Sequence, residues 1–232
     1  MNPHMLRSPL LFVTSMVGCQ MPKGGKGGKD AAVEEARDSL RITGADFFDL
    51  MLLHYPCRTG PDSWDTDYTM QTVAALGVLV DEGVSRAIGV SNFHEPMLHG
   101  FEKAMAAGIF KFPPVLNQIG FAVGAHRYKE SVVEHTRKLN MVPIAFSPLG
   151  GNICGHACSI DSLNHPVVVK LARVKGVHPS LILLRWVLQR NVGILTSSKN
   201  PKHIASDLKV FELTLTADEM KLLSDVPELP PV

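Results

Sequence analysis

A histidine and a tyrosine stand where a strongly apolar stretch of the chain ends. The run Phe47–Leu53 is apolar apart from Asp49, and His54 and Tyr55 follow it directly. Its length and composition predict a β-strand that is buried on both faces. In a barrel of parallel strands the catalytic groups lie at the carboxyl ends of the strands. His54 is therefore a candidate for orienting a ligand and Tyr55 for lining its pocket, although a strand-end histidine can also simply bond to backbone.

Two further polar groups follow neighbouring apolar runs. Ser91 and Asn92 come directly after the run Arg86–Val90, and Gln118 lies within the run Val115–Ile119. Hydroxyl and amide groups together offer hydrogen-bond donors and acceptors, as a carboxamide ligand requires. The alternative interpretation of the Ser-Asn pair is an ordinary turn between a strand and a helix.

Two other segments contain residue types that occur in binding sites, but their sequence patterns do not match a binding motif. Cys154-Gly155-His156-Ala157-Cys158 offers three metal-ligating side chains, but the sequence has no second Cys/His pair with matching spacing, so we expect a loop and no metal site. Residues 20–29 are rich in glycine and lysine but lack the pattern of a phosphate-binding loop, which favours a flexible loop.

Strands and helices alternate along the chain. The expected strands are Leu10–Thr14, the run after Asp46, Arg86–Val90, Val115–Ile119, Val142–Phe146 and Val192–Leu195. The expected helices run from an N-cap at Asp30 to Gly44, around Val73–Val80, and over Glu95–Ala107, Lys129–Leu139, Pro166–Gly176, Pro179–Gln189 and Pro201–Val210. This alternation predicts an α/β fold with a parallel sheet and six β/α units in a single domain over residues 1–232.

Composition excludes several classes of partner. The chain has 232 residues, 45% hydrophobic content and a formal net charge of +1, which gives no electrostatic case for nucleic acid or an anionic membrane. No run approaches a membrane span of about 20 apolar residues. Four irregularly spaced cysteines favour reduced thiols and a cytoplasmic protein. The rival interpretation is a short signal peptide in which Pro9–Val13 is the apolar region and Cys19 a lipoprotein-like cysteine.

Three sequence motifs together carry a family resemblance. DFFDLMLLHYP at 46–56, RAIGVSNF at 86–93 and VLNQI at 115–119 resemble the aldo-keto reductase family. The resemblance implies a (β/α)8 TIM barrel in which NADPH transfers a hydride to an aldehyde or ketone, with His54 as a catalytic residue. It covers Leu10 to about Val226 and starts at the third strand of the barrel. We therefore expect an incomplete, N-terminally shortened barrel whose open edge a partner or a second copy could cover.

The same resemblance implies a cofactor site. Ser91, Asn92 and Gln118 match the residues that bind the nicotinamide carboxamide, and Phe146 matches the aromatic ring that stacks on it. Ser147 and Leu149 match the pyrophosphate loop. The positions matching the segment that grips the adenosine 2′-phosphate include Ser197, Ser198, His203 and Asp207, and Lys199 lies close by in the sequence. NADP(H) is the expected cofactor, with NAD(H) as the alternative because serine and histidine replace two cations.

The catalytic set is less complete than the cofactor set. Family members protonate the alkoxide with a tyrosine that a lysine and an aspartate tune, and the lysine closes a T-[ST]-K pattern. This chain reads Thr14-Ser15-Met16 at that pattern, and the aspartate and tyrosine would belong to the two absent units. The expected function is reduction of a small carbonyl compound. The alternative is a catalytically defective relative, either a binding module or a truncated gene product.

Overall fold

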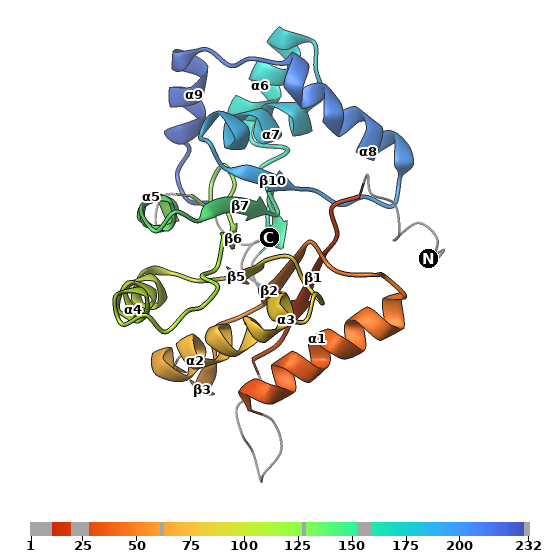
Figure 1. Cartoon of the computed structure of the whole chain (residues 1–232). Helices are drawn as coiled ribbons and strands as arrows, with labels where there is room; N and C mark the ends of the chain where they lie inside the picture. Colours follow the sequence, from red (N-terminus) through yellow and green to blue (C-terminus); the bar gives the residue numbers. More distant parts are fainter. Residues whose placement is uncertain (1–10, 20–27, 61–62, 127–128, 153–158, 230–232) are drawn as a thin grey trace. The chain divides into compact units, whose positions relative to one another are not determined.

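Two compact units make up the part of the chain that the structure describes. The computed structural model describes residues 11–19, 28–60, 63–126, 129–152 and 159–229. The first unit contains the residues up to Asn117 together with His135–Met141, and the second contains Gln118–Glu134 and the residues from Val142 onward. Each unit has its own strands and covering helices (Figure 1). Residues 20–27 of the expected Gly/Lys loop lie outside the described residues, and the single-domain expectation stays a prediction.

Six strands form the sheet in the order β1-β2-β5-β6-β7-β10. Their bounds are β1 Thr14–Val17, β2 Leu50–Leu53, β5 Ile88–Ser91, β6 Leu116–Gly120, β7 Val142–Phe146 and β10 Gly193–Leu195. In the first unit β1 pairs with β2 and β2 with β5, both in parallel, and in the second β7 pairs in parallel with β10. Every residue of β2 and β5 is buried, as expected for strands covered on both faces. The parallel TIM-barrel type of fold with six β/α units is confirmed.

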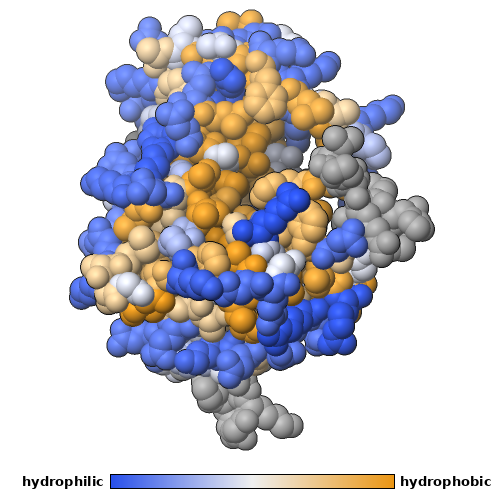
Figure 2. All heavy atoms as spheres, in the orientation of Figure 1, coloured by the Kyte–Doolittle hydropathy of each residue, from blue (hydrophilic) through white to orange (hydrophobic). Residues whose placement is uncertain are grey.

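Helices of the first unit pack with their apolar sides on the strands and on each other. They are α1 Lys29–Thr43, α2 Thr66–Leu76, α3 Val78–Asp81 and α4 Glu95–Ala106, with a short hairpin of β3 Arg58–Gly60 and β4 Ser63–Trp64. Helix α1 contacts β1 and α2 and buries Ala32 and Ala36. Its outer side is hydrophilic (Figure 2), and there Arg37 forms ion pairs with Glu34 and Glu82. These exposed pairs contribute little to stability.

Helix α7 is the most buried helix of the second unit. The elements of this unit after β7 are the hairpin of β8 Gly151–Asn152 and β9 Ser159–Ile160, α6 Pro166–Lys175, α7 Pro179–Gln189, α8 Pro201–Asp207, the 3-10 helix η3 Leu208–Glu212 and α9 Ala217–Ser224. Helix α7 contacts α6, η3 and β10. Helix α5, Glu130–Lys138, begins in the second unit and continues into residues of the first. Among the described helices, none combines the length and apolar composition that crossing a membrane needs.

Trp186 on α7 is the largest fully buried side chain of the second unit. Its ring stacks on Phe121, with ring centroids 5.4 Å apart and an interplanar angle of 15°. The imidazole of His126 meets the same indole edge-on at 4.9 Å, and the indole Nε1 donates to the hydroxyl of Ser224 at 3.1 Å. One residue therefore joins α7 to α9 and to the segment that follows β6.

Local boundaries differ from the expectation where distant contacts decide them. The expected first strand, Leu10–Thr14, is displaced: β1 runs over Thr14–Val17. The amide of Val13 donates to the carboxylate of Asp49 at 2.8 Å, and Thr14 pairs with Leu50, so β2 sets where β1 begins.

Two helix boundaries also differ from the expectation. The first helix begins at Lys29, so Asp30 lies in its first turn and is not its N-cap. Helix α9 was not expected, although Thr216 and Glu219 form a capping box at its start, which is a sequence signal for a helix.

Candidate functional site

The carboxyl ends of β2 and β5 hold the four candidate residues of the first unit. His54 directly follows β2, and its amide donates to the carbonyl oxygen of Val17 at 2.9 Å. Ser91 closes β5, and Asn92 follows it. The Nδ2 of Asn92 donates to the carbonyl oxygen of His54 at 2.9 Å and lies 3.1 Å from the hydroxyl oxygen of Ser91. One amide group thus ties the two strand ends together.

Asn92 has the backbone conformation that this arrangement requires. Its φ is 62°, in the left-handed region that asparagine tolerates better than most residues. The turn brings its side chain back over the end of β2 while Ser91 stays almost fully buried. The expected alternative, an ordinary strand-to-helix turn, describes the backbone but does not account for a side chain that reaches the neighbouring strand.

The imidazole of His54 is half-buried, and no charged group among the described residues stabilises its cationic form. Removal from water lowers its pKa below the ordinary value of 6.5. The imidazole is therefore neutral at pH 7 and can donate or accept one hydrogen bond from each ring nitrogen according to its tautomer. A neutral imidazole suits a group that orients a carbonyl oxygen.

Tyr55 lies beside His54, contrary to the expectation from strand geometry. Alternation along a strand predicts that the two side chains point to opposite faces. Their ring centroids are instead 4.3 Å apart, with the planes tilted by 33°. Strand β2 ends at Leu53, so alternation does not extend to these residues. Tyr55 is 45% exposed, and its phenol is consequently a second polar group next to the imidazole.

Met16 occupies the position at which the family resemblance implies a lysine. It lies within β1, paired with Leu52 and half-buried. A thioether carries no charge and is a weak hydrogen-bond acceptor. The side chain at this position therefore cannot supply a cation to a neighbouring phenol or imidazole.

A disulfide joins the segments that follow β1 and β2. Cys19 is bonded to Cys57, and their Cα atoms are 5.1 Å apart. Cys57 is fully buried, and its sulfur lies 3.7 Å from the hydroxyl oxygen of Thr72 on α2. The expectation of reduced thiols is wrong for this pair, because parallel pairing of β1 with β2 brings two cysteines together that are 38 residues apart in sequence. Cys154 and Cys158 lie outside the described residues.

Removing this disulfide is expected to destabilise the protein. Cys19→Ala should lower the free energy of unfolding by about 2–4 kcal/mol, because the unfolded chain regains the freedom that a cross-link of this span removes. Urea unfolding, followed by far-UV circular dichroism, measures the change. The double variant with Cys57→Ala removes the same cross-link, so its loss should exceed that of the single variant only by the cost of one buried side-chain atom. Equal stability of wild type and Cys19→Ala under oxidising conditions would contradict the disulfide.

The candidate residues of the second unit lie in β6 and at the carboxyl end of β7. Gln118 is a buried residue of β6. Phe146 closes β7, and its carbonyl oxygen accepts from the amide of Phe121 at 3.4 Å. Ser147 has a φ of 49° and begins a tight turn in which its carbonyl oxygen accepts from Gly150 at 3.0 Å. Leu149 packs against the apolar cluster of α7 and η3 and so anchors this turn.

The remaining candidate residues cluster around the start of α8. The hydroxyl of Ser198 lies 3.5 Å from Nδ1 of His203 and accepts from the amide of Asn200 at 3.1 Å. Asn200 in turn caps α8 by accepting from the amide of Lys202. The side chains of Ser197 and Lys199 belong to exposed residues of the same turn, and Asp207 is the last residue of α8. Hydroxyl, imidazole and ammonium groups thus face solvent together, as a phosphate ligand requires.

Two elements of the site could not be found from sequence patterns. Neither the disulfide nor the closeness of His54 and Tyr55 has a local sequence signal, because both depend on how β1 and β2 end. The expected loop at Cys154–Cys158 lies outside the described residues.

Comparison with known proteins gives one consistent result. The model of the aldo/keto reductase family matches residues 8–228. Morphine 6-dehydrogenase of Pseudomonas putida is 30% identical over 232 residues, which cover 97% of this chain and 71% of that protein. Estradiol 17 beta-dehydrogenase 5 of Mus musculus is 31% identical over 233 residues, which cover 93% of this chain and 68% of that protein.

Solved structures agree with the sequence comparison. An aldo-keto reductase from a Medee basin deep-sea metagenome library has a TM-score of 0.77 and 26% identity over 96% of this chain and 73% of that chain. The Bombyx mori aldo-keto reductase in complex with NADP has a TM-score of 0.74 and 27% identity over 94% of this chain and 68% of that chain.

Proposed function

Since the chain belongs to the aldo/keto reductase family, we propose that it binds NADP(H) and that its chemistry is hydride transfer to the carbonyl group of an aldehyde or ketone. The arrangement at the ends of β2 and β5 carries the proposal. There the amide of Asn92 is held between the carbonyl oxygen of His54 and the hydroxyl of Ser91. The nicotinamide carboxamide would bind at this pair, and the neutral imidazole of His54 would orient the substrate carbonyl.

The second unit carries further residues that match the family's cofactor-binding positions. Phe146 ends β7 with a ring suited to stacking on a nicotinamide, and Gln118 offers an amide from β6. Ser147 and Leu149 form a turn of fixed conformation for the pyrophosphate. The exposed set around Ser198 and His203 would take the adenosine 2′-phosphate. NADP(H) is the proposed cofactor, in keeping with the NADP-bound Bombyx mori relative.

Met16 favours a second candidate function. With a thioether at the position of the expected lysine, no cation from β1 can lower the pKa of a proton donor. The alternative is a protein that binds the dinucleotide but transfers hydride weakly or not at all.

We also propose that the protein is cytoplasmic, although a disulfide such as Cys19–Cys57 is uncommon in a reducing cytosol.

Cofactor titration tests the proposed site. NADPH binding, followed by cofactor fluorescence, should weaken by about 2–12-fold in Asn92→Gly and in Gln118→Ala, because each change removes one neutral hydrogen-bonding group worth about 0.5–1.5 kcal/mol. Lys199→Ala should weaken binding of NADPH and leave binding of NADH unchanged, because only NADPH carries the 2′-phosphate.

The chain provides a matched control for Asn92→Gly. Asn140 has a φ of 59°, close to that of Asn92, and lies just beyond α5. Asn140→Gly makes the same chemical change in the same backbone conformation and should leave NADPH binding unchanged. Binding that is unaffected by both Asn92→Gly and Gln118→Ala would remove the proposed site. Failure of the wild-type chain to bind either dinucleotide would favour a structural role.

A further inference from the structure

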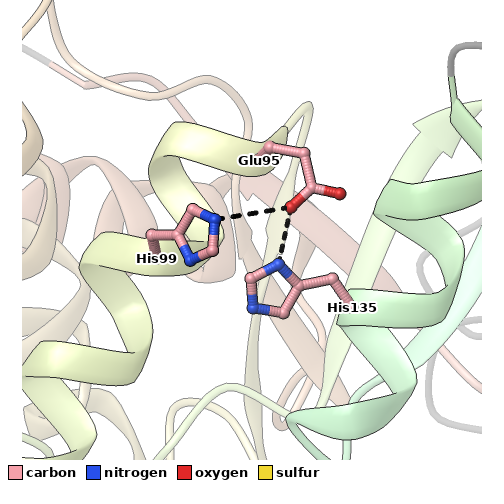
Figure 3. A group of neighbouring side chains, drawn as sticks. All are labelled: Glu95, His99 and His135. Atoms are coloured by element: carbon pink, nitrogen blue, oxygen red, sulfur yellow. Dashed lines mark hydrogen bonds and ion pairs between the residues drawn. The ribbon is translucent and has the colours of Figure 1, made fainter.

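Two histidines and two glutamates form a cluster on the first unit, beside the start of α4. Glu95 and His99 are one helical turn apart on α4, and His135 comes from α5 (Figure 3). Oε2 of Glu95 lies 2.7 Å from Nδ1 of His135 and 4.0 Å from Nε2 of His99. These three atoms lie within 4.8 Å of one another. Two imidazole nitrogens and one carboxylate oxygen therefore converge on a single point.

The carboxylate of Glu102 lies beside the outer nitrogens of the same two imidazoles. Its Oε2 lies 3.2 Å from Nδ1 of His99, and its Oε1 lies 3.1 Å from Nε2 of His135. The second contact is within ion-pair range, although its direction does not meet hydrogen-bond geometry. A carboxylate that holds the outer N–H of a histidine directs the lone pair of the inner nitrogen to the opposite side.

We propose that Glu95, His99 and His135 bind a zinc ion, with Glu102 as the outer carboxylate that orients both histidines. Two imidazoles and a carboxylate are a common zinc ligand set, with the fourth position left to water. The charges also match, since the carboxylates of Glu95 and Glu102 together balance the two positive charges of the ion. None of these residues belongs to the proposed cofactor site.

Small side-chain movements bring the cluster to tetrahedral geometry. Zinc bonds of about 2.0–2.1 Å place neighbouring ligand atoms about 3.3–3.4 Å apart. The Glu95–His135 pair at 2.7 Å would have to open, and the Glu95–His99 pair at 4.0 Å would have to close. The side chain of His99 is 63% exposed and has room to move, whereas that of His135, at 10%, is enclosed. The ion would replace the proton shared by Glu95 and His135 and would join α4 to α5.

Zinc titration of the metal-free protein tests the site. All proteins carry Cys154→Ser and Cys158→Ser, because cysteine is itself a zinc ligand. A chromophoric chelator reports zinc uptake, and we expect one tightly bound ion per chain. His99→Ala should lower zinc affinity by more than about 100-fold, and Glu102→Gln by about 10–100-fold, as is typical when an outer-shell partner is lost.

Matched controls separate a built site from surface chelation. His203→Ala removes an exposed imidazole of α8 and should leave zinc affinity unchanged. X-ray absorption spectra of the zinc-loaded protein should show two imidazole ligands and no sulfur. Equal loss of affinity in His203→Ala and His99→Ala, or saturable binding that His99→Ala leaves intact, would overturn the proposal. Absence of zinc uptake by a protein with wild-type circular dichroism would do the same, whatever the outcome for NADPH.

Discussion

The chain of residues 1–232 is expected to oxidise NADPH with 4-nitrobenzaldehyde about 10²–10⁴-fold more slowly than family members that carry the complete set of acid groups. Met16 supplies no cation where the family resemblance implies a lysine. His54 is neutral at pH 7 because burial lowers its pKa, so it can orient a carbonyl oxygen but offers no positive charge to the developing alkoxide. Loss of NADPH absorbance with time measures the rate.

Variants of His54 and Tyr55 show which of the two side chains any remaining turnover depends on. His54→Ala should abolish residual turnover, whereas Tyr55→Phe removes only a phenol from the ring pair. If turnover is robust and falls with Tyr55→Phe, the phenol is the proton donor and the proposal of a defective catalyst is wrong. Robust turnover that depends on His54 and not on Tyr55 would also contradict the proposal of a defective catalyst, and another group would then have to supply the proton.

Trp186→Ala is expected to lower the free energy of unfolding by about 3–5 kcal/mol. The indole is completely buried, stacks on Phe121 and donates to Ser224. Its removal leaves a cavity and also removes one of the hydrogen bonds to the hydroxyl of Ser224, which still accepts from Arg190 at 3.2 Å. Urea unfolding should be followed by far-UV circular dichroism, because the change removes one of only two tryptophans.

Two comparison variants identify the source of this loss. Trp186→Phe keeps a ring against Phe121 but lacks the Nε1 donor, so it should lose clearly less than Trp186→Ala. Phe211→Ala truncates an aromatic residue that is 69% exposed, and it should change stability by no more than about 0.5 kcal/mol. Equal effects of Trp186→Ala and Phe211→Ala would show that the indole does not carry the packing of this unit.

Local patterns were sufficient where a segment's own residues decide its structure. Strand β7, Val142–Phe146, has the expected bounds, and α6 and α7 begin at Pro166 and Pro179 as expected. In each case the determinants lie within a few residues: an apolar run, or a proline at the first helical position. The strand ends that hold Ser91 and Asn92 were predicted for the same reason.

Contacts between residues that are far apart in the sequence determine the features that local sequence patterns did not predict. The start of β1 depends on Asp49, whose carboxylate accepts from Val13 across 36 residues of sequence. The contacts of His135 with His99 and Glu102 depend on how α4 and α5 pack, and no spacing in the sequence indicates them. Ring orientation at Tyr55 likewise follows from the residue at which β2 stops.

The bond between Cys19 and Cys57 has a consequence for the covalent integrity of the chain. It encloses the lysines at 23, 26 and 29 together with all of α1. A protease that cuts once after any of these lysines opens the backbone but does not release a fragment, because the sulfur–sulfur bond still joins the two pieces. Strand β1 would then remain attached beside β2, and the cleaved protein would separate into two chains only under reducing conditions.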